Sequence, residues 1–158
     1  MRPVPATVLT NAFYAFYDLH RPVYHAYAQA HLPPEEAQVA VSHLFNLVAD
    51  NWTTVVAERR PSQWAWKRHT DTVARRSGRT LTAVENASLL HDQLLLNVDQ
   101  IATVTGTEPA AVTALLSAAR REVRTGRARP RPWTAAARPT VATGPGWRRT
   151  LCLRAAAV

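Results

Sequence analysis

Apolar residues recur at helical spacing along most of the chain and predict an all-α fold. The first such segment covers residues 11–31, where Pro22 marks either a bend in one helix or a break between two short ones. A second helix of about five turns is expected to begin at Pro34, because prolines followed by acidic residues favour a helix start. Its apolar stripe consists of Val39, Leu44, Phe45, Val48, Trp52 and Val55.

From Pro61 onward the sequence carries clear boundary signals for four more helices. A third helix is expected from Pro61 to Gly78, and a fourth from Thr82, the predicted N-cap, to about Leu95. Two helices follow at 98–105 and 109–124, separated by a tight turn at Gly106. This layout predicts a helix-turn-helix, in which the first helix braces a second that enters the major groove of DNA. An ordinary helical hairpin is the alternative.

Charge is distributed unevenly over the 158 residues and their net charge of +8. Residues 1–78 carry +2, residues 79–124 carry −1, and residues 125–158 carry +7. The last segment is rich in proline, alanine and arginine without a sustained apolar period, so we expect a disordered basic tail. The rest is long enough for one ordinary domain or two very small ones.

Composition also narrows the class of protein. No apolar run is long enough to cross a membrane, and the N-terminus lacks a secretory signal, so we expect a cytoplasmic protein without a membrane partner. The single Cys152 excludes an intramolecular disulfide, and no two of the six histidines are three or four residues apart. We therefore expect surface or helix-end histidines, no metal, no cofactor and no enzyme activity; no serine lies in a nucleophile elbow.

The predicted helix-turn-helix resembles a known family. Residues 100–124, QIATVTGTEPAAVTALLSAARREVR, are similar to the C-terminal promoter-reading domain of extracytoplasmic-function sigma factors of the sigma-70 family, in a divergent form of actinobacterial type. The positions that match the family pattern are Ile101, Ala102, Gly106, Val112, Leu116, Ala119 and Arg120.

The N-terminal half resembles the same family more faintly, through an aromatic first helix, an acidic-start second helix and a proline-aromatic-basic third helix. The resemblance implies two small helical domains: a sigma region 2-like domain at 8–78 and a region 4-like helix-turn-helix domain at 79–124. It implies promoter DNA and core RNA polymerase as partners, with an anti-sigma or other regulatory protein as a further one. The tail at 125–158 lies outside it.

Candidate site residues follow from this resemblance. Polymerase contacts would lie on the second helix, at Val41, Ser42 and Phe45. Trp66 lies off the apolar stripe and is the candidate for stacking on bases, whereas Trp52 and Trp64 are assigned to the core. The expected DNA contacts are Trp66, Lys67, Arg68, Arg75, Arg76, Arg79, Thr107, Ala110, Thr113, Ala114, Ser117, Arg120, Arg121 and Arg124.

Departures from the family pattern keep two alternatives open. Residues 41–43 replace an acidic, glutamine-containing run, and the second helix of the helix-turn-helix exposes mainly alanine and threonine. One alternative is a degenerate relative that has lost promoter reading and binds another regulator. The other is a stand-alone helix-turn-helix repressor or activator, acting as a dimer on a symmetric site.

Overall fold

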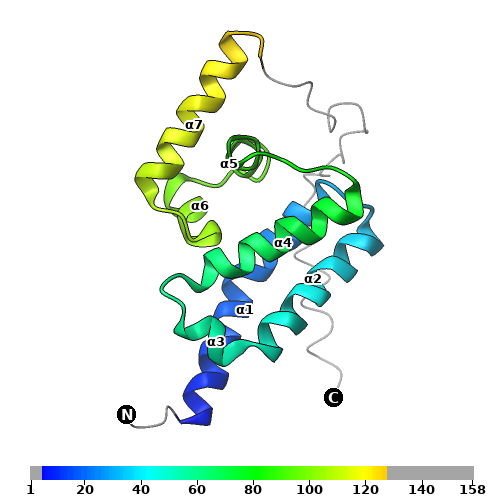
Figure 1. Ribbon diagram of the computed structural model, residues 1–158, viewed down its shortest axis with the longest axis vertical. Helices are drawn as coiled ribbons and strands as arrows, with labels where there is room; N and C mark the ends of the chain where they lie inside the picture. Colours follow the sequence, from blue (N-terminus) through cyan, green and yellow to red (C-terminus); the bar gives the residue numbers. More distant parts are fainter. Residues whose placement is uncertain (1–4, 128–158) are drawn as a thin grey trace, which may run out of the picture.

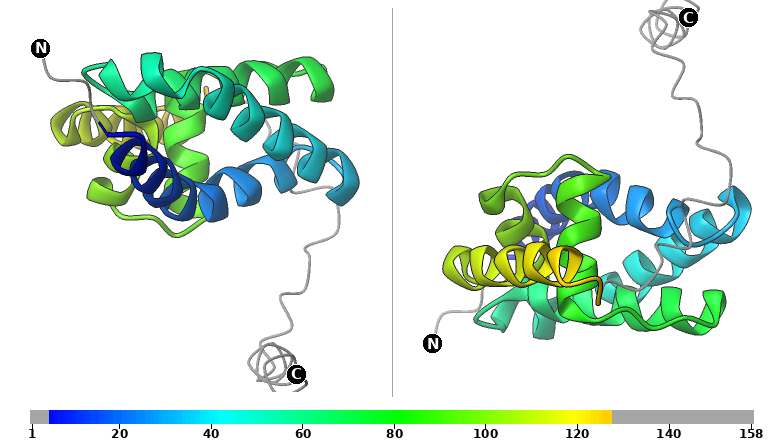
Figure 2. Two further views of the ribbon diagram at one scale, coloured as in Figure 1. Left: turned by 90° about the horizontal axis from the view of Figure 1, so that it is seen from below. Right: turned by 90° about the horizontal axis from the view of Figure 1, so that it is seen from above.

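The computed structural model describes residues 5–127, which form seven helices and no strand (Figures 1 and 2). The fold is therefore all-α, as the apolar periodicity predicted. The predicted tail at 125–158 lies almost wholly outside the described residues. The helices are α1 (Ala6–Gln29), α2 (Pro34–Asp50), α3 (Trp52–Ala57), α4 (Pro61–Ser77), α5 (Ala83–Asp92), α6 (Val98–Thr105) and α7 (Pro109–Arg124).

Helix α1 is one continuous helix that contains Pro22, so the two-helix option for this segment is wrong. Its buried face carries Phe16, His20, Tyr24 and Tyr27, which recur at spacings of three or four residues. A helix with such a buried stripe tolerates the hydrogen bond that a proline removes, because packing stabilises it.

The second predicted helix is divided at Asn51 into α2 and α3. The Asn51 side-chain amide donates to the carbonyl oxygen of Leu47 at 2.8 Å, and its backbone has left the helical conformation (φ −113°). An asparagine that satisfies a helix-end carbonyl in this way ends the helix early. Val39, assigned to the apolar stripe, is 49% exposed, so that assignment is wrong.

Helix α5 begins with the predicted cap: the Thr82 hydroxyl accepts from the backbone N–H of Glu85, whose carboxylate accepts from the Thr82 N–H. It ends at Asp92, three residues before the predicted end. The backbone N–H of Leu94 donates to the carbonyl oxygen of Leu89. Leu95 has a positive φ of 57°, and its side chain is 81% exposed.

Helix α4 lies at the centre of the molecule and packs against α2 on one side and α6 on the other (Figure 1). Helices α5, α6 and α7 form a second group beside it, in which α7 packs on both α5 and α6. Buried side chains from both groups belong to a single apolar cluster. No helix among residues 5–127 is long and apolar enough to cross a membrane.

Candidate nucleic-acid interface

Helices α6 and α7 are joined by a tight turn whose residues explain its geometry. Asn97 and Gln100 cap the start of α6 reciprocally, a capping box that the sequence reasoning missed although asparagine followed by glutamine three residues later signals it. Gly106 ends α6 in the left-handed region (φ 68°), and Pro109 opens α7. Ile101, Val104, Val112 and Leu116 are buried where the two helices meet.

Helix α7 exposes the face that was predicted to meet DNA. Ala110, Thr113 and Ala114 are exposed, and Thr107 and Ser117 are half-buried. The Thr113 hydroxyl donates to the carbonyl oxygen of Pro109 at 3.0 Å, so its proton is already used within the helix. The small side chains on this face of α7 would allow close approach to a DNA groove, but they offer few groups that can distinguish bases.

The arginines of α7 lie at its other end. Arg120, Arg121 and Arg124 are exposed and, with Ser117, line a groove of about 560 Å³ between α5 and α7. Guanidinium groups in such positions suit contacts with phosphate, which position a protein on DNA without reading sequence.

The predicted contacts on α4 and directly after it form a second group. Arg68, Arg75 and Arg79 line one groove of about 700 Å³, together with His43 of α2. Arg76 is instead paired with Glu36 of α2 at 2.5 Å. Lys67 is paired with Asp71 at 3.3 Å, an exposed pair that a phosphate could displace because such pairs contribute little stability.

Both tryptophans of α4 are half-buried and pack against the apolar core, as expected for Trp64 but not for Trp66. The ring of Trp66 packs inward, with its centroid 4.8 Å from that of Tyr27 and 5.8 Å from that of Tyr24. Trp64 is half-buried beneath the Arg68 guanidinium, which lies 3.7 Å from its ring centroid. Trp64 is therefore the aromatic ring that stands beside the cationic groups.

A basic pocket at the start of α4 was also missed by the sequence reasoning. It has a volume of about 580 Å³ and contains Arg59 and Arg60 together with Trp64, Lys67 and Arg68. The two consecutive arginines directly before Pro61 were the available signal. A pocket that combines cations with an aromatic ring can hold a phosphate and a stacked base.

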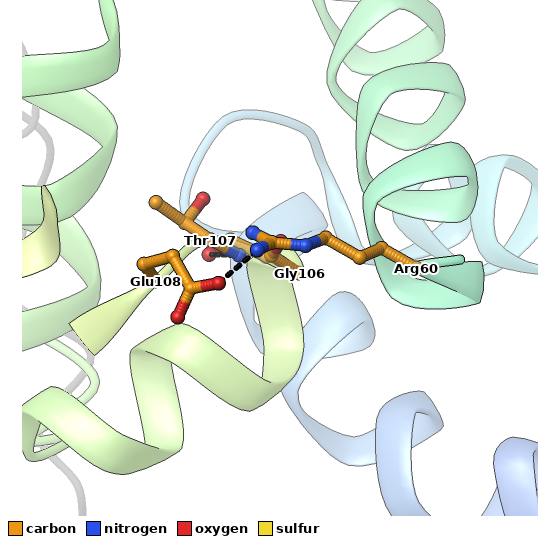
Figure 3. Close-up of polar contacts among 5 residues, drawn as sticks. Arg60, Gly106, Thr107 and Glu108 are labelled. Atoms are coloured by element: carbon orange, nitrogen blue, oxygen red, sulfur yellow. Dashed lines mark hydrogen bonds and ion pairs between the residues drawn. The ribbon is translucent and has the colours of Figure 1, made fainter.

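Arg60 also joins this pocket to the α6–α7 turn (Figure 3). Its guanidinium donates to the carbonyl oxygen of Gly106 at 3.1 Å and pairs with the carboxylate of Glu108. Gly106 lies so close to α4 that a Cβ added there would be 2.4 Å from the backbone nitrogen of Gln63. Only glycine fits this contact.

Two buried tyrosines connect the helix groups further. The Tyr24 hydroxyl donates to the carbonyl oxygen of Val104 in α6 at 3.1 Å. The Tyr27 hydroxyl donates to the side-chain oxygen of Asn86 in α5 at 2.8 Å. Burial raises the pKa of both tyrosines above the usual range, so both are neutral donors at neutral pH.

The expectation of surface or helix-end histidines is wrong for His20 and His69, which are 2% and 0% exposed. His20 lies 3.1 Å from the Ser62 hydroxyl, and His69 donates to the carbonyl oxygen of Tyr24 at 2.8 Å. Desolvation lowers the pKa of each to about 4, and that of His31 likewise. Within residues 5–127 no three potential ligands come together to hold a metal ion.

Most of the predicted polymerase contacts are in the core. Val41 and Phe45 are each 4% exposed, and the Phe45 ring centroid lies 4.7 Å from that of Tyr17. Ser42 alone of the three is exposed. A partner that docks on α2 would therefore meet Ser42 and its exposed neighbours rather than the two apolar side chains.

Comparisons with known proteins found no matching family model, no matching curated protein and no matching solved structure. The resemblance to extracytoplasmic-function sigma factors rests on the residues quoted above and stays a prediction. The arrangement of the basic residues on α4 and α7 supplies the further argument about function.

Proposed function

We propose that this protein is a cytoplasmic, non-enzymatic, sigma-factor-like transcription regulator that binds promoter DNA. The observation that carries the proposal is the α6–α7 pair: a short helix, a glycine turn and a longer helix with one buried and one exposed face. This is the arrangement by which a helix-turn-helix presents its second helix to the major groove. In this proposal α1–α4 correspond to the region 2-like unit and α5–α7 to the region 4-like unit.

The side chains suggest a division of labour between the two units. The small residues Ala110 and Ala114 let α7 approach base edges, while Arg120, Arg121 and Arg124 contact phosphates. On α4, the pocket around Trp64 supplies a stacking ring and cations, the combination that suits unpaired bases beside a phosphate backbone. Most of the affinity would be electrostatic and would fall as salt rises.

A second candidate function is a protein-interaction module. It is favoured by Glu108, which places a carboxylate at the start of α7, the end that should meet DNA. The burial of Val41 and Phe45 also speaks against contact with core polymerase through those two side chains. Such a module would bind an anti-sigma or other regulatory protein and would not retain DNA. Retention of a DNA duplex by the full chain therefore separates the two candidates.

The experiment is a pair of binding measurements on the immobilised full-length chain. The first uses 30-base-pair duplexes of promoter and random sequence at several salt concentrations, and we expect salt-sensitive binding of both. The second uses purified core RNA polymerase with a conventional sigma factor as competitor. Competed retention of polymerase identifies an initiation subunit, whereas DNA binding without polymerase retention identifies a stand-alone regulator. If the chain retains neither DNA nor core polymerase, the proposal is overturned.

A further inference from the structure

We propose that the groove between α5 and α7 is a docking site for an acidic amphipathic helix of a partner protein, and that this helix competes there with DNA. The docking site rests on the geometry and charge of the groove alone, whereas the competition rests on the proposed DNA-binding function. Two features support the docking site: an apolar row on α7 that ends uncovered, and arginines beside it.

Helix α7 extends beyond the helix that covers it. It packs across α5, and its second half continues past α5 (Figure 1). An apolar row runs along α7 at spacings of four, three and four residues, at Val112, Leu116, Ala119 and Val123. Val112 and Leu116 are 1% and 6% exposed, but Val123 is 57% exposed. The row that packs α7 onto the other helices therefore continues into the groove without a cover.

Arginines surround the uncovered end of this row. Arg120, Arg121 and Arg124 are exposed and line the groove, which has a volume of about 560 Å³. Among the described residues that line it, the one acid is Asp92, whose carboxylate accepts the Ser88 hydroxyl at 2.8 Å. The lining therefore carries more positive than negative charge, next to an exposed apolar side chain.

An acidic amphipathic helix is complementary to both features. Its apolar stripe would pack on Ala119 and Val123, as helices do when they bind in apolar grooves. Its carboxylates, beside that stripe, would accept hydrogen bonds from the guanidinium groups. DNA would satisfy the arginines equally well, but a phosphate backbone gains nothing from an exposed valine between them. The apolar row therefore favours the protein helix as the occupant of this groove.

The charge of the groove disfavours two other occupants. A second copy of the chain, bound through the same groove by a two-fold axis, would bring the arginines of both copies together. Residues 125–158 of the chain carry seven arginines and no acidic residue, so the groove would repel them. The complementary charge must come from another protein.

The docked helix and DNA would use the same arginines. Arg120, Arg121 and Arg124 are the residues of α7 that the proposed function assigns to phosphate contacts. A carboxylate that pairs with one of these guanidinium groups takes the position of a phosphate oxygen. The two partners therefore exclude each other, and the acidic helix would release the protein from DNA.

The test measures binding of a labelled peptide to the full chain by fluorescence anisotropy. The peptide is a designed helix of about 18 residues, with leucines along one face and glutamates on either side of them. One control peptide has alanine in place of leucine, and another has lysine in place of glutamate. The protein variants are Val123→Thr in the groove and Val8→Thr, at a valine of α1 that is 52% exposed. Binding of a DNA duplex is measured in parallel.

We expect the acidic leucine peptide to bind at least tenfold more tightly than either control peptide. Val123→Thr should weaken its binding roughly threefold or more relative to Val8→Thr, because a hydroxyl replaces part of the apolar contact. The same substitution should leave the affinity for duplex DNA unchanged. An excess of the peptide should displace the bound duplex.

The docking site is overturned if the acidic leucine peptide does not bind at roughly 1 mM, or if Val123→Thr and Val8→Thr bind it equally well. Equal binding of the leucine and alanine peptides overturns it too, because the groove would then be a purely electrostatic site of the kind that suits DNA. Simultaneous binding of peptide and duplex overturns the competition. If no protein binds the duplex, the proposed function fails, while the peptide measurements still decide the docking site.

Discussion

The hydroxyl of Tyr24 in α1 donates to the carbonyl oxygen of Val104 in α6, across 80 positions of sequence. The tyrosine ring is fully buried and lies between the rings of His20 and His69, with centroids 5.4 Å and 5.0 Å away. The Tyr24–Val104 hydrogen bond joins α1 to α6, the helix that precedes the α6–α7 turn. The packing of the N-terminal helices therefore helps to fix the position of α7.

Replacing Tyr24 with phenylalanine should lower the free energy of unfolding by about 1–3 kcal/mol, because a buried carbonyl would no longer have its donor. Urea denaturation measures the change. Tyr14, which is 59% exposed on the same helix, provides the control, and Tyr14→Phe should leave the free energy of unfolding almost unchanged. Equal effects of the two substitutions would show that the Tyr24 hydrogen bond does not stabilise the fold.

The two glycines that end α4 and α6 offer a matched pair. Gly78 and Gly106 have φ values of 69° and 68°, so alanine at either position costs roughly 1–2 kcal/mol for the left-handed conformation. At Gly106 the added Cβ would also lie 2.4 Å from the Gln63 backbone nitrogen. We expect Gly106→Ala to lower the melting temperature clearly more than Gly78→Ala, as measured by circular dichroism.

If both glycine variants have the same melting temperature, the α6–α7 turn does not pack against α4 in solution. The comparison is independent of charge, since neither substitution changes an ionisable group.

Acid should destabilise the protein between pH 6.5 and pH 4. His20, His31 and His69 have their pKa lowered to about 4 by burial, whereas in the unfolded chain they titrate near 6.5. The unfolded state thus binds more protons in this range, and stability, fully present above pH 6.5, falls as pH falls by about 1.4 kcal/mol per pH unit for each histidine. Unfolding by urea at several pH values measures the slope.

The His20→Gln variant should reduce that slope, because His20 has a lowered pKa in the folded state. An equal slope in the wild type and in His20→Gln would mean that His20 binds its proton equally well in the folded and unfolded states.

The sequence predicted the helices well because their apolar stripes and end signals are local. Gly78, Thr82 and Gly106 each mark a boundary through their own backbone or side chain, and the structure places all three as expected. The end of α2 at Asn51 was missed because the apolar stripe continues across it into α3. Residue type alone does not say that an asparagine will bond to a helix-end carbonyl.

The candidate site was less predictable, because it depends on contacts between distant segments. Trp64 and Trp66 differ by two positions, and only the packing of Tyr24 and Tyr27 shows which ring is turned inward. The role of Arg60 depends on Glu108, 48 residues later. The buried histidines were misassigned for the same reason: their burial depends on partners supplied by other helices.

The two tryptophans of α4 should differ in their response to replacement. Trp64→Ala should weaken binding of a single-stranded oligonucleotide by about 1–3 kcal/mol, the contribution of one stacked base. Trp66→Ala should lower the free energy of unfolding by roughly 2 kcal/mol, because its ring packs against two tyrosines. Fluorescence anisotropy measures the binding and urea denaturation the stability. The reverse pattern would restore Trp66 as the stacking residue.

The most direct test of the proposed DNA-binding function is the salt dependence of duplex binding by the full chain with Arg120, Arg121 and Arg124 all replaced by alanine. The control is Arg21→Ala on the exposed surface of α1, far along the chain from α7. If α7 lies on DNA, the triple variant should bind more weakly, with Arg21→Ala close to wild type. The slope of log affinity against log salt should fall by about one for each phosphate that the triple variant no longer neutralises. An affinity and a slope unchanged in the triple variant would contradict the account.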